Sequence, residues 1–496
     1  MSVLRSTART LTASAVLVGT LAAPAMVHVA DAQVTPAATL AAPATSALDW
    51  LANELATGGG AAGQSHILGQ TLDFGQGPTF FPDYGLTADA VMDLALAGVH
   101  PGEVTASLNN IQDHIGDYVT SGAFAPADRY AGALGKSLLL ANITGRNPHA
   151  FGGFDLEQEL RARLQTTGIK AGRFTDDAKF GDPTAASEDF SNGFGQAIDM
   201  LALSRTSSGV PASAIDFLLA QQCPGGGFRS VYDATAPAVS TRGCATDAEA
   251  DPDATAIALD ALITVPAAPG VPAATAKAVA KLVALQDAGG GFASSAGTLN
   301  ANTTGLAGQA LRTVGLITLA DKAAAFVASL QVTAPVAPTA ANGDLAPAAA
   351  GPAPADLGAF AFSVADHTAA EAAGIAAAAR DKFHRATAQG ILAFGIDPFG
   401  VVAAPPAPPA PTTTTTVAVT TADPGATTTT TAAATTTSTV AGAAGATTTT
   451  TVAKAAGHLP VTGNDVLDVA LAALALFGVG EIARRAAREQ AARSRS

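Results

Sequence analysis

A seven-residue string that occurs twice constrains the fold of this chain more than any other feature. Residues 222–228 read QCPGGGF and residues 286–292 read QDAGGGF, so both copies match Q-x-x-G-G-G-F. In each copy an apolar segment with helical spacing precedes the glutamine, and a segment rich in Ala and Leu follows the phenylalanine. A recurring unit of helix, glycine turn and helix predicts a fold built from stacked helix pairs.

Weaker copies extend this pattern in both directions. Gln112 leads to the turn at residues 122–124, Gln165 leads to the turn at 172–174, and Gln331 begins a degenerate sixth copy. The helix around Trp50, Leu51 and Glu54 begins an equally degenerate first copy. The second helix of each pair is expected near residues 87–96, 129–140, 192–203, 253–262, 303–311 and 385–394.

The two helices of each pair differ in their polarity. The second helix is apolar on nearly all sides, as in residues 256–259, so it is expected to be buried all round. The first helix keeps a polar face, as where Lys277 and Lys281 stand four residues apart, so it is expected to lie outside. Six inner helices ringed by six outer ones predict an all-α head, an α/α toroid of six helix pairs over residues 45–397.

The repeat resembles the prenyltransferase and squalene-oxidase repeat. The string Q-x-x-G-G-G-F is followed here by a helix start of the type D-x-x-x-T-A, at residues 251–256, which read DPDATA. Proteins with this repeat include terpene cyclases, protein prenyltransferase β subunits, cobalamin carriers and complement-type thioester domains. The resemblance implies the toroid fold, but it does not choose among functions that share that fold.

A terpene-cyclase function would place the chemistry on Asp253. Proton-initiated cyclases use D-x-D-D-T-A, and the resemblance aligns Asp253 with the proton donor, while Ala254 replaces the last Asp. Such enzymes also stabilise carbocations with the faces of aromatic rings. In this chain only 5% of the residues are aromatic, and there is one Trp. The alternative is that Asp253 and Thr255 cap a buried helix.

The other chemistries of the superfamily lack their residues. Protein prenyltransferases bind zinc through Asp, Cys and a distant His, but Arg242 stands where the Asp before Cys244 is required. A zinc site of Cys244 with His367 or His384 is therefore not predicted. Residues 243–246, GCAT, also depart from the thioester string G-C-G-E-Q. We predict no metal and no cofactor.

The chain has two cysteines, Cys223 and Cys244, within one loop between helices. In an exported protein such a pair is expected to form a disulfide, with a pair of reduced thiols as the alternative. Closing the loop stabilises the fold by roughly 3 kcal/mol in the loop-entropy treatment.

Polar residues near the starts of the inner helices are the candidates for a binding site. In a toroid these helices surround a central funnel, and polar groups above an apolar pit are the usual arrangement of a ligand site. The alternative is that these residues cap helices and pack against one another. The candidates are Asp89, Tyr130, Asn192, Gln196, Asp253, Asn302, Gln309, His384 and Gln389.

The two ends of the chain predict export and attachment. Residues 1–32 combine Arg5 and Arg9 with an apolar run and an A-x-A pattern, which is typical of a secretory signal peptide. Residues 401–458 are rich in Thr, Pro and Ala with almost no charge, so they are expected to form a disordered stalk that reaches on the order of 150 Å.

Residues 459–496 resemble the LPXTG sorting signal of Gram-positive bacteria. Leu459, Pro460, Val461, Thr462 and Gly463 are followed by a short apolar segment and an arginine-rich tail. The resemblance implies that a sortase cleaves after Thr462 and joins the chain to peptidoglycan. The apolar segment contains Asp468 and Glu481, which favours transient retention in the membrane over a permanent span.

These features predict a secreted protein, covalently anchored to the cell wall, that displays a toroid head. The formal net charge of −14 makes nucleic acid an unsuitable partner. Our main interpretation is a binding or interaction head, with sortase and peptidoglycan as partners and no strong sign of catalysis. The alternative is a toroid enzyme, terpene-cyclase-like or a polysaccharide lyase or hydrolase, with Asp253 as the acid.

Overall fold

A computed structural model of the protein describes residues 40–59, 64–73, 78–232, 243–333 and 352–400. Within these residues the chain is mainly helical, with short two-stranded sheets between the helices. The signal peptide predicted at 1–32, the stalk at 401–458 and the sorting signal at 459–496 lie outside the described residues. Among the helices that are described, none combines the length and the apolar character needed to cross a membrane.

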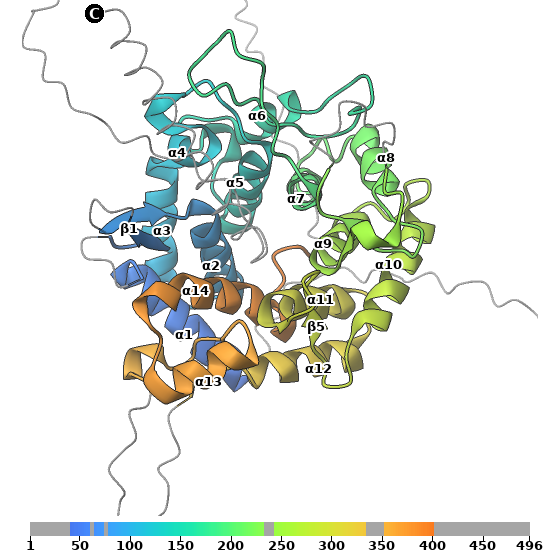
Figure 1. Cartoon of the computed structure of the whole chain (residues 1–496). Helices are drawn as coiled ribbons and strands as arrows, with labels where there is room; N and C mark the ends of the chain where they lie inside the picture. The colour runs from blue at the N-terminus through green and yellow to red at the C-terminus, as the bar shows by residue number, and fades with distance from the viewer. Residues whose placement is uncertain (1–39, 60–63, 74–77, 233–242, 334–351, 401–496) are drawn as a thin grey trace, which may run out of the picture. The chain divides into compact units, whose positions relative to one another are not determined.

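Six helices form a closed inner ring, as Figure 1 shows in a view along the ring axis. Each packs on the next around the ring, and the last packs on the first. In chain order they are α2 (Tyr84–Ala97), α5 (Ala131–Thr144), α7 (Gly193–Ser204), α9 (Pro252–Ile263), α11 (Ala301–Thr313) and α14 (Arg380–Gly390). Their positions confirm the predicted second helices, and the fold is an α/α toroid.

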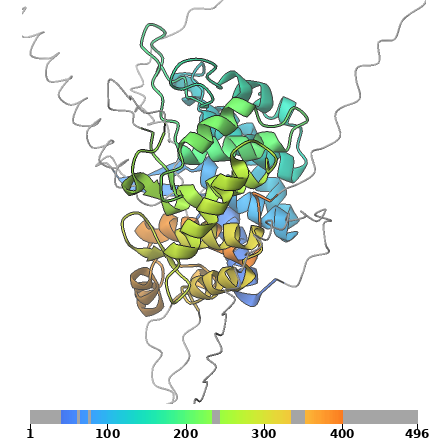
Figure 2. The ribbon, with the colours of Figure 1, turned by 90° about the vertical axis from the view of Figure 1, so that its right-hand side faces the viewer.

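An outer layer of helices surrounds this ring. Figure 2 shows part of that layer from the side, with the green and yellow helices facing the viewer. The outer helices are α1 (Ala42–Thr57), α3 (Pro101–Asp113), α6 (Leu156–Ala162), α8 (Ala212–Ala220), α10 (Val271–Leu285) and α12 (Ile317–Ala328). Two further helices, α4 (Ile115–Val119) and α13 (Val364–Ala373), lie in the connections of the described chain.

The two layers have the polarity expected from the sequence. All residues from Ala254 to Leu262 on α9 are buried, whereas Lys277 on α10 is exposed. Glycines let the inner helices approach closely: a Cβ on Gly135 of α5 would lie 1.9 Å from Asp199 Oδ1 on α7. Small residues on the inner helices therefore set the narrow spacing of the ring.

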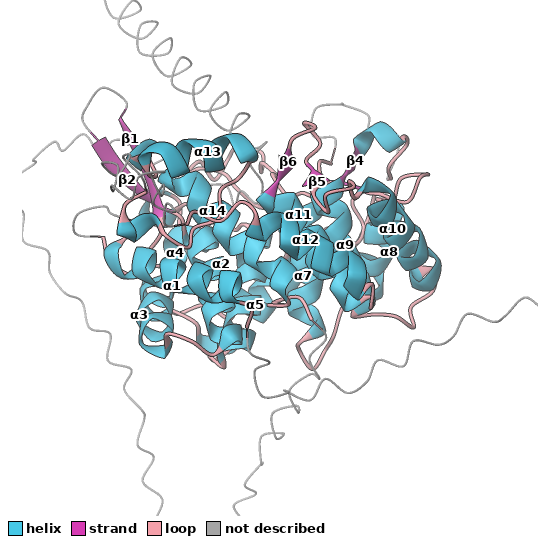
Figure 3. Cartoon of the chain, turned by 90° about the horizontal axis from the view of Figure 1, so that it is seen from below, coloured by secondary structure: helices cyan, strands magenta, loops and turns pink. Residues whose placement is uncertain are grey.

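The strands lie at one end of the toroid, where long loops connect an outer helix to the next inner helix (Figure 3). They form three antiparallel pairs among the described residues. The pairs are β1 (Gly69–Asp73) with β2 (Pro78–Pro82), β3 (Phe228–Arg229) with β4 (Ala250–Asp251), and β5 (Phe292–Ala293) with β6 (Leu299–Asn300). The long loops and inner helix starts thus share one face of the ring.

The phenylalanine of each strong repeat is fixed to the inner helix that follows it. The backbone N–H of Phe228 donates to Thr255 Oγ1 at 2.9 Å, and Phe292 donates in the same way to Thr304. Both phenylalanine side chains are fully buried. The threonine of the D-x-x-x-T-A string therefore has an architectural function.

The glutamine of each repeat ties its turn to the next outer helix. Gln222 Nε2 donates to Ala274 O at 2.8 Å, which joins the fourth copy to α10. Gln286 Nε2 donates to Leu319 O at 2.9 Å on α12. In the sixth copy Gln331 Nε2 donates to Pro43 O at 2.8 Å on α1, so the same bond closes the ring.

Two weaker copies depart from this pattern. Phe124 of the second copy is 55% exposed, so its turn does not supply a core side chain. In the third copy Gln165 donates to Thr175 instead of reaching the next outer helix. Gln196 on α7 substitutes for it by donating to Gly172 O and, on α8, to Ala214 O.

Cys223 and Cys244 form the predicted disulfide, with a Cα–Cα distance of 4.8 Å. The bond holds the loop that leads from α8 to α9. Cys244 is therefore not available as a metal ligand.

Candidate functional site

One face of α11 points to the axis of the ring. Leu306 on this helix lines a central cavity, and Gln309 and Thr313 contact a segment that crosses the ring. These residues follow the spacing of a single helix face, on which the next residue towards the helix start is Asn302. The axial face of α11 therefore carries Asn302 at the end with the long loops.

The other inner helices present axial faces with the same spacing. Each contributes one to three residues, which lie near the helix start, at the cavity or below it. The axial positions are Asp89 and Asp93 on α2, Lys136 on α5, Phe194, Ile198 and Arg205 on α7, Asp253, Ile257 and Asp260 on α9, and Arg385 and Gln389 on α14.

The central cavity has a volume of about 30 Å³, which holds one or two water molecules. Most of its wall is apolar, and its polar groups come from α2, α5 and α14. The lining residues are Asp89, Met92, Asp93, Lys136, Phe194, Ile198, Ile257, Leu306, Ala388, Gln389, Leu392, Pro398 and Phe399.

Two aspartates and a lysine form the charged part of this cavity. Lys136 Nζ lies 2.9 Å from the Asp89 carboxylate, and its side chain is only 5% exposed. Burial raises the pKa of Asp89, and the ion pair with Lys136 opposes that rise. Asp89 is thus the more readily ionised of the two acids.

Asp93 lies one helical turn after Asp89 and is only 1% exposed. Its Oδ2 atom has no hydrogen-bond partner among the described residues. Burial raises the pKa of Asp93 well above the usual value for aspartate, and the charge of Asp89 raises it further. Burial and the charge of Asp89 therefore both favour the neutral form of the Asp93 carboxyl group.

A segment at the end of the head, residues 396–400, forms the floor of the cavity. Pro398 and Phe399 line the cavity from below. Arg205 donates to the carbonyl oxygens of Pro398 and Gly400 at 2.8 and 2.9 Å. Asp397 accepts from Gln309 Nε2 at 2.7 Å, which ties the floor to α11.

Asp260 on α9 lies near this floor and is 2% exposed. Burial raises the pKa of Asp260 well above its usual value, and the charge of Asp397 adds to that rise. The nearby amide of Gln309 offsets the rise only in part. Asp260 is thus a second buried acid for which burial favours the neutral form, next to the floor and outside the cavity lining.

Four of the residues predicted to form the funnel mouth make structural bonds instead. Tyr130 bonds with Ser121 through its hydroxyl at 2.8 Å, and Asn192 caps α7 by accepting from Gly195 N. Gln196 ties the third repeat together, as described above. His384 Nε2 lies 2.7 Å from Glu54 Oε2, where the last inner helix meets α1.

The remaining predicted residues lie on the axial faces. Asp89 and Gln389 line the cavity, whereas Gln309 contacts the floor. Asn302 and Asp253 stand one turn above cavity residues, by helix spacing. The structure therefore gathers part of the predicted set around one axis.

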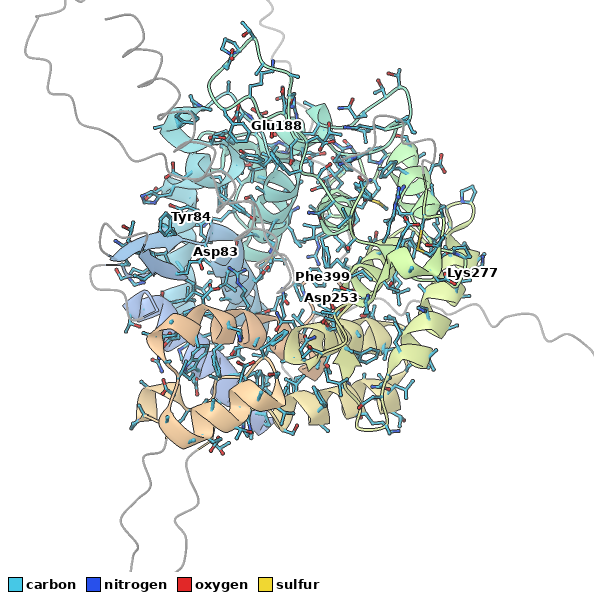
Figure 4. All side chains as sticks on the ribbon, viewed as in Figure 1. Asp83, Tyr84, Glu188, Asp253, Lys277 and Phe399 are labelled. Carbon is cyan, nitrogen blue, oxygen red and sulfur yellow. A yellow bond between two sulfur atoms is a disulfide. The ribbon has the colours of Figure 1, made fainter. Side chains whose placement is uncertain are left out.

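Asp253 is not among the residues that line the cavity. The capping residue of α9 is Asp251, whose Oδ1 accepts from Ala254 N at 2.8 Å, and Asp253 follows in the first turn. In Figure 4, which looks along the axis, the labels of Asp253 and Phe399 lie together at the inner side of the ring.

Asp93 and Lys136 were missed by the sequence reasoning. That reasoning selected polar residues at helix starts, whereas these two lie in the middle of apolar inner helices. The available signal was a single charged residue inside an apolar run, as in residues 92–95 (MDLA) and 134–138 (LGKSL). Charges in such places are buried only when they are paired or neutralised.

Comparison with known proteins gives a structural likeness alone. No protein-family model and no curated protein sequence matches the chain. A type II terpene cyclase, MstE from Scytonema, is 15% identical with a TM-score of 0.43, covering 72% of this chain and 97% of that one. A protein from Actinoplanes is 16% identical with a TM-score of 0.42, covering 71% and 98%. The unsaturated glucuronyl hydrolase of Bacillus sp. GL1 is 9% identical with a TM-score of 0.43, covering 70% and 95%.

Proposed function

We propose that the toroid head is a proton-transferring enzyme that acts on an apolar substrate, with Asp93 as the proton donor. One observation carries this proposal. Asp93 is a buried acid with a raised pKa and an unpartnered oxygen, and it faces a cavity whose other walls are largely apolar. A neutral acid in such a place is suited to general-acid chemistry.

The neighbours of Asp93 support this assignment. The charge of Asp89 disfavours a second carboxylate nearby, so the proton stays on Asp93 until a substrate takes it. Once the proton has left, Lys136 stabilises the Asp93 carboxylate. The three groups can therefore hold a proton and accommodate its loss.

The cavity walls favour an alkene over a sugar. Met92, Ile257 and Leu306 offer no hydrogen bonds, whereas a polysaccharide needs several polar partners. We therefore favour a cyclase-like reaction on an isoprenoid chain over a lyase or hydrolase reaction. Because the cavity is water-sized, Phe194 or Phe399 must move to admit such a chain.

The test is product formation by the purified head, residues 37–400, with squalene and geranylgeraniol, analysed by gas chromatography and mass spectrometry. Asp93→Asn is expected to lower turnover by about 100-fold or more, the usual contribution of a general acid. Asp199→Asn is the matched control, because Asp199 is equally buried and has a raised pKa but does not line the cavity. Equal losses in both variants would contradict the assignment.

A second candidate is a binding head without turnover. The observation that favours it is that residues 396–400 close one end of the funnel and leave only a water-sized cavity at the centre of the ring. Saturable binding of a ligand that wild-type protein leaves unchanged would support this candidate. In either case we propose display on the cell wall through residues 459–463, which rests on the sequence.

A further inference from the structure

Asn302 is an unusual residue for a helix interior. Its side chain is only 2% exposed, and neither its Nδ2 nor its Oδ1 atom has a hydrogen-bond partner among the described residues. Leaving buried donors and acceptors unpaired costs about 1–3 kcal/mol per group, and native proteins rarely do so. The two unpaired atoms of Asn302 therefore call for a partner that is not part of the described chain.

The position of Asn302 indicates where that partner lies. Asn302 stands one turn above Leu306 on the axial face of α11, and Leu306 lines the cavity. The neighbouring helix α14 contributes Gln389, which also lines the cavity and whose Oε1 atom has no described partner. Two amides from adjacent helices thus face the axis at and above the cavity.

We propose that Asn302, with Gln389, binds the uncharged hydrogen-bonding head group of an amphiphilic ligand whose apolar part enters the cavity. A hydroxyl or carboxamide both donates and accepts, which matches the free donor and acceptor of Asn302. The apolar part would lie against residues such as Ile257 and Leu306.

The charges near the mouth exclude ionised head groups of negative sign. Asp253 stands one turn above the cavity on α9, by helix spacing, and Asp89 lines the cavity on α2. The axial cations Lys136 and Arg385 are already paired, Lys136 with Asp89 and Arg385 with Asp83 and Asp381. An anionic head group would therefore meet carboxylates without a free counter-charge.

The inference deepens the proposed function because it concerns the same cavity, but its test does not depend on turnover. Hexan-1-ol and hexanamide are compared with 1-chlorohexane and hexylammonium, by calorimetric titration of the 37–400 head. None of these probes contains an alkene. A protein that binds them as expected but converts no isoprenoid would retain the head-group site and lose the proposed reaction.

Wild-type protein is expected to bind hexan-1-ol and hexanamide about tenfold more tightly than 1-chlorohexane, the equivalent of one net hydrogen bond. Asn302→Leu is expected to abolish this preference without lowering the Tm, because it removes unpaired polar atoms. Asn142→Leu, on α5 and outside the cavity, is the control and should keep the preference.

Three results would overturn the inference. They are equal affinity for the alcohol and the chloride in wild type, tightest binding of hexylammonium, or an unchanged preference in Asn302→Leu. If Asn302→Leu unfolds, Asn302→Ala serves as the second variant. It removes the amide donor and acceptor without adding volume, and it is expected to lose the preference for the alcohol and the amide over the chloride.

Discussion

Buried acids inside the ring, whose pKa values are raised, affect how the stability of the head depends on pH. Burial raises the pKa of Asp93, Asp199 and Asp260 well above the value of free aspartate. A group whose pKa is raised by folding contributes its full stabilisation at pH values below the pKa that it has in the unfolded state. That stabilisation is lost as the pH rises through the folded pKa. These three residues therefore oppose folding increasingly as the pH rises above about 4.

Asp260→Asn is the residue-scale test of this sign. The variant is expected to be more stable than wild type at pH 8, on the order of 1 kcal/mol, because an amide needs no proton to stay neutral. The gain should shrink towards pH 4. Urea unfolding of the head at several pH values measures it, and a gain that does not change with pH would show that Asp260 is not protonated in the folded state.

Single residues were also where the sequence was least informative. The resemblance directed attention to Asp253, but Asp251 caps α9 and Thr255 fixes Phe228, so most of the D-x-x-x-T-A string is architectural. Asp93 carries no motif. Its burial depends on neighbours from other helices, which a single sequence does not reveal.

At the scale of elements, the inner helices α2, α5, α7 and α9 could be predicted from their apolar composition, whereas the polar helix α14 was predicted only from its place in the repeat. Helices that are apolar on all sides must lie inside, and each predicted second helix overlaps an observed one. The floor at residues 396–400 could not be predicted. It has no repeat or periodicity, and it is held by Arg205 and Gln309, which are far away in the sequence.

Phe399 tests the floor as an element. Phe399→Ala is expected to lower the stability of the head by about 2–4 kcal/mol, because it opens a void beside the cavity. The enlarged apolar space should bind benzene, so benzene should raise the Tm of the variant but not that of wild type.

The control for this experiment is Phe180→Ala. Phe180 packs against Phe190, with ring centroids 6.2 Å apart, and does not line the cavity. It is expected to lose stability without any response to benzene. A response to benzene in both variants, or in neither, would argue against a floor formed by Phe399.

At the scale of the whole molecule, stability depends on closing the ring. Where α14 meets α1, Glu54 accepts from Arg380 at 2.6 Å and contacts His384 Nε2 at 2.7 Å. Although burial acts to raise the pKa of Glu54, its bonds with His384 and Arg380 lower it below the usual value. This contribution is present above about pH 4.5 and is lost as the pH falls through the lowered pKa.

Glu54→Gln is expected to cost about 3 kcal/mol at pH 7, because it breaks the ion pair between Glu54 and Arg380 and leaves Arg380 with Asp356 alone. The control is Glu159→Gln, which should cost less than about 1 kcal/mol, because the side chain of Glu159 is 30% exposed and that of Glu54 only 4%. Guanidinium unfolding measures both. Similarly small losses of stability in both variants would mean that the contact between α14 and α1 does not hold the ring closed.

The attachment of the molecule to the wall remains a prediction, since residues 459–496 lie outside the described chain. The sorting-signal resemblance predicts a covalent bond from Thr462 to peptidoglycan. Thr462→Ala, expressed in a Gram-positive host with a sortase, is therefore expected to move the protein from the wall fraction to the medium and the membrane. Val461→Ala should stay on the wall, because that position varies in the motif.

Release of wild-type protein by muramidase, with retention during boiling in detergent, separates a covalent bond from adhesion. If Thr462→Ala were retained in the same way, the head would reach the wall by another route.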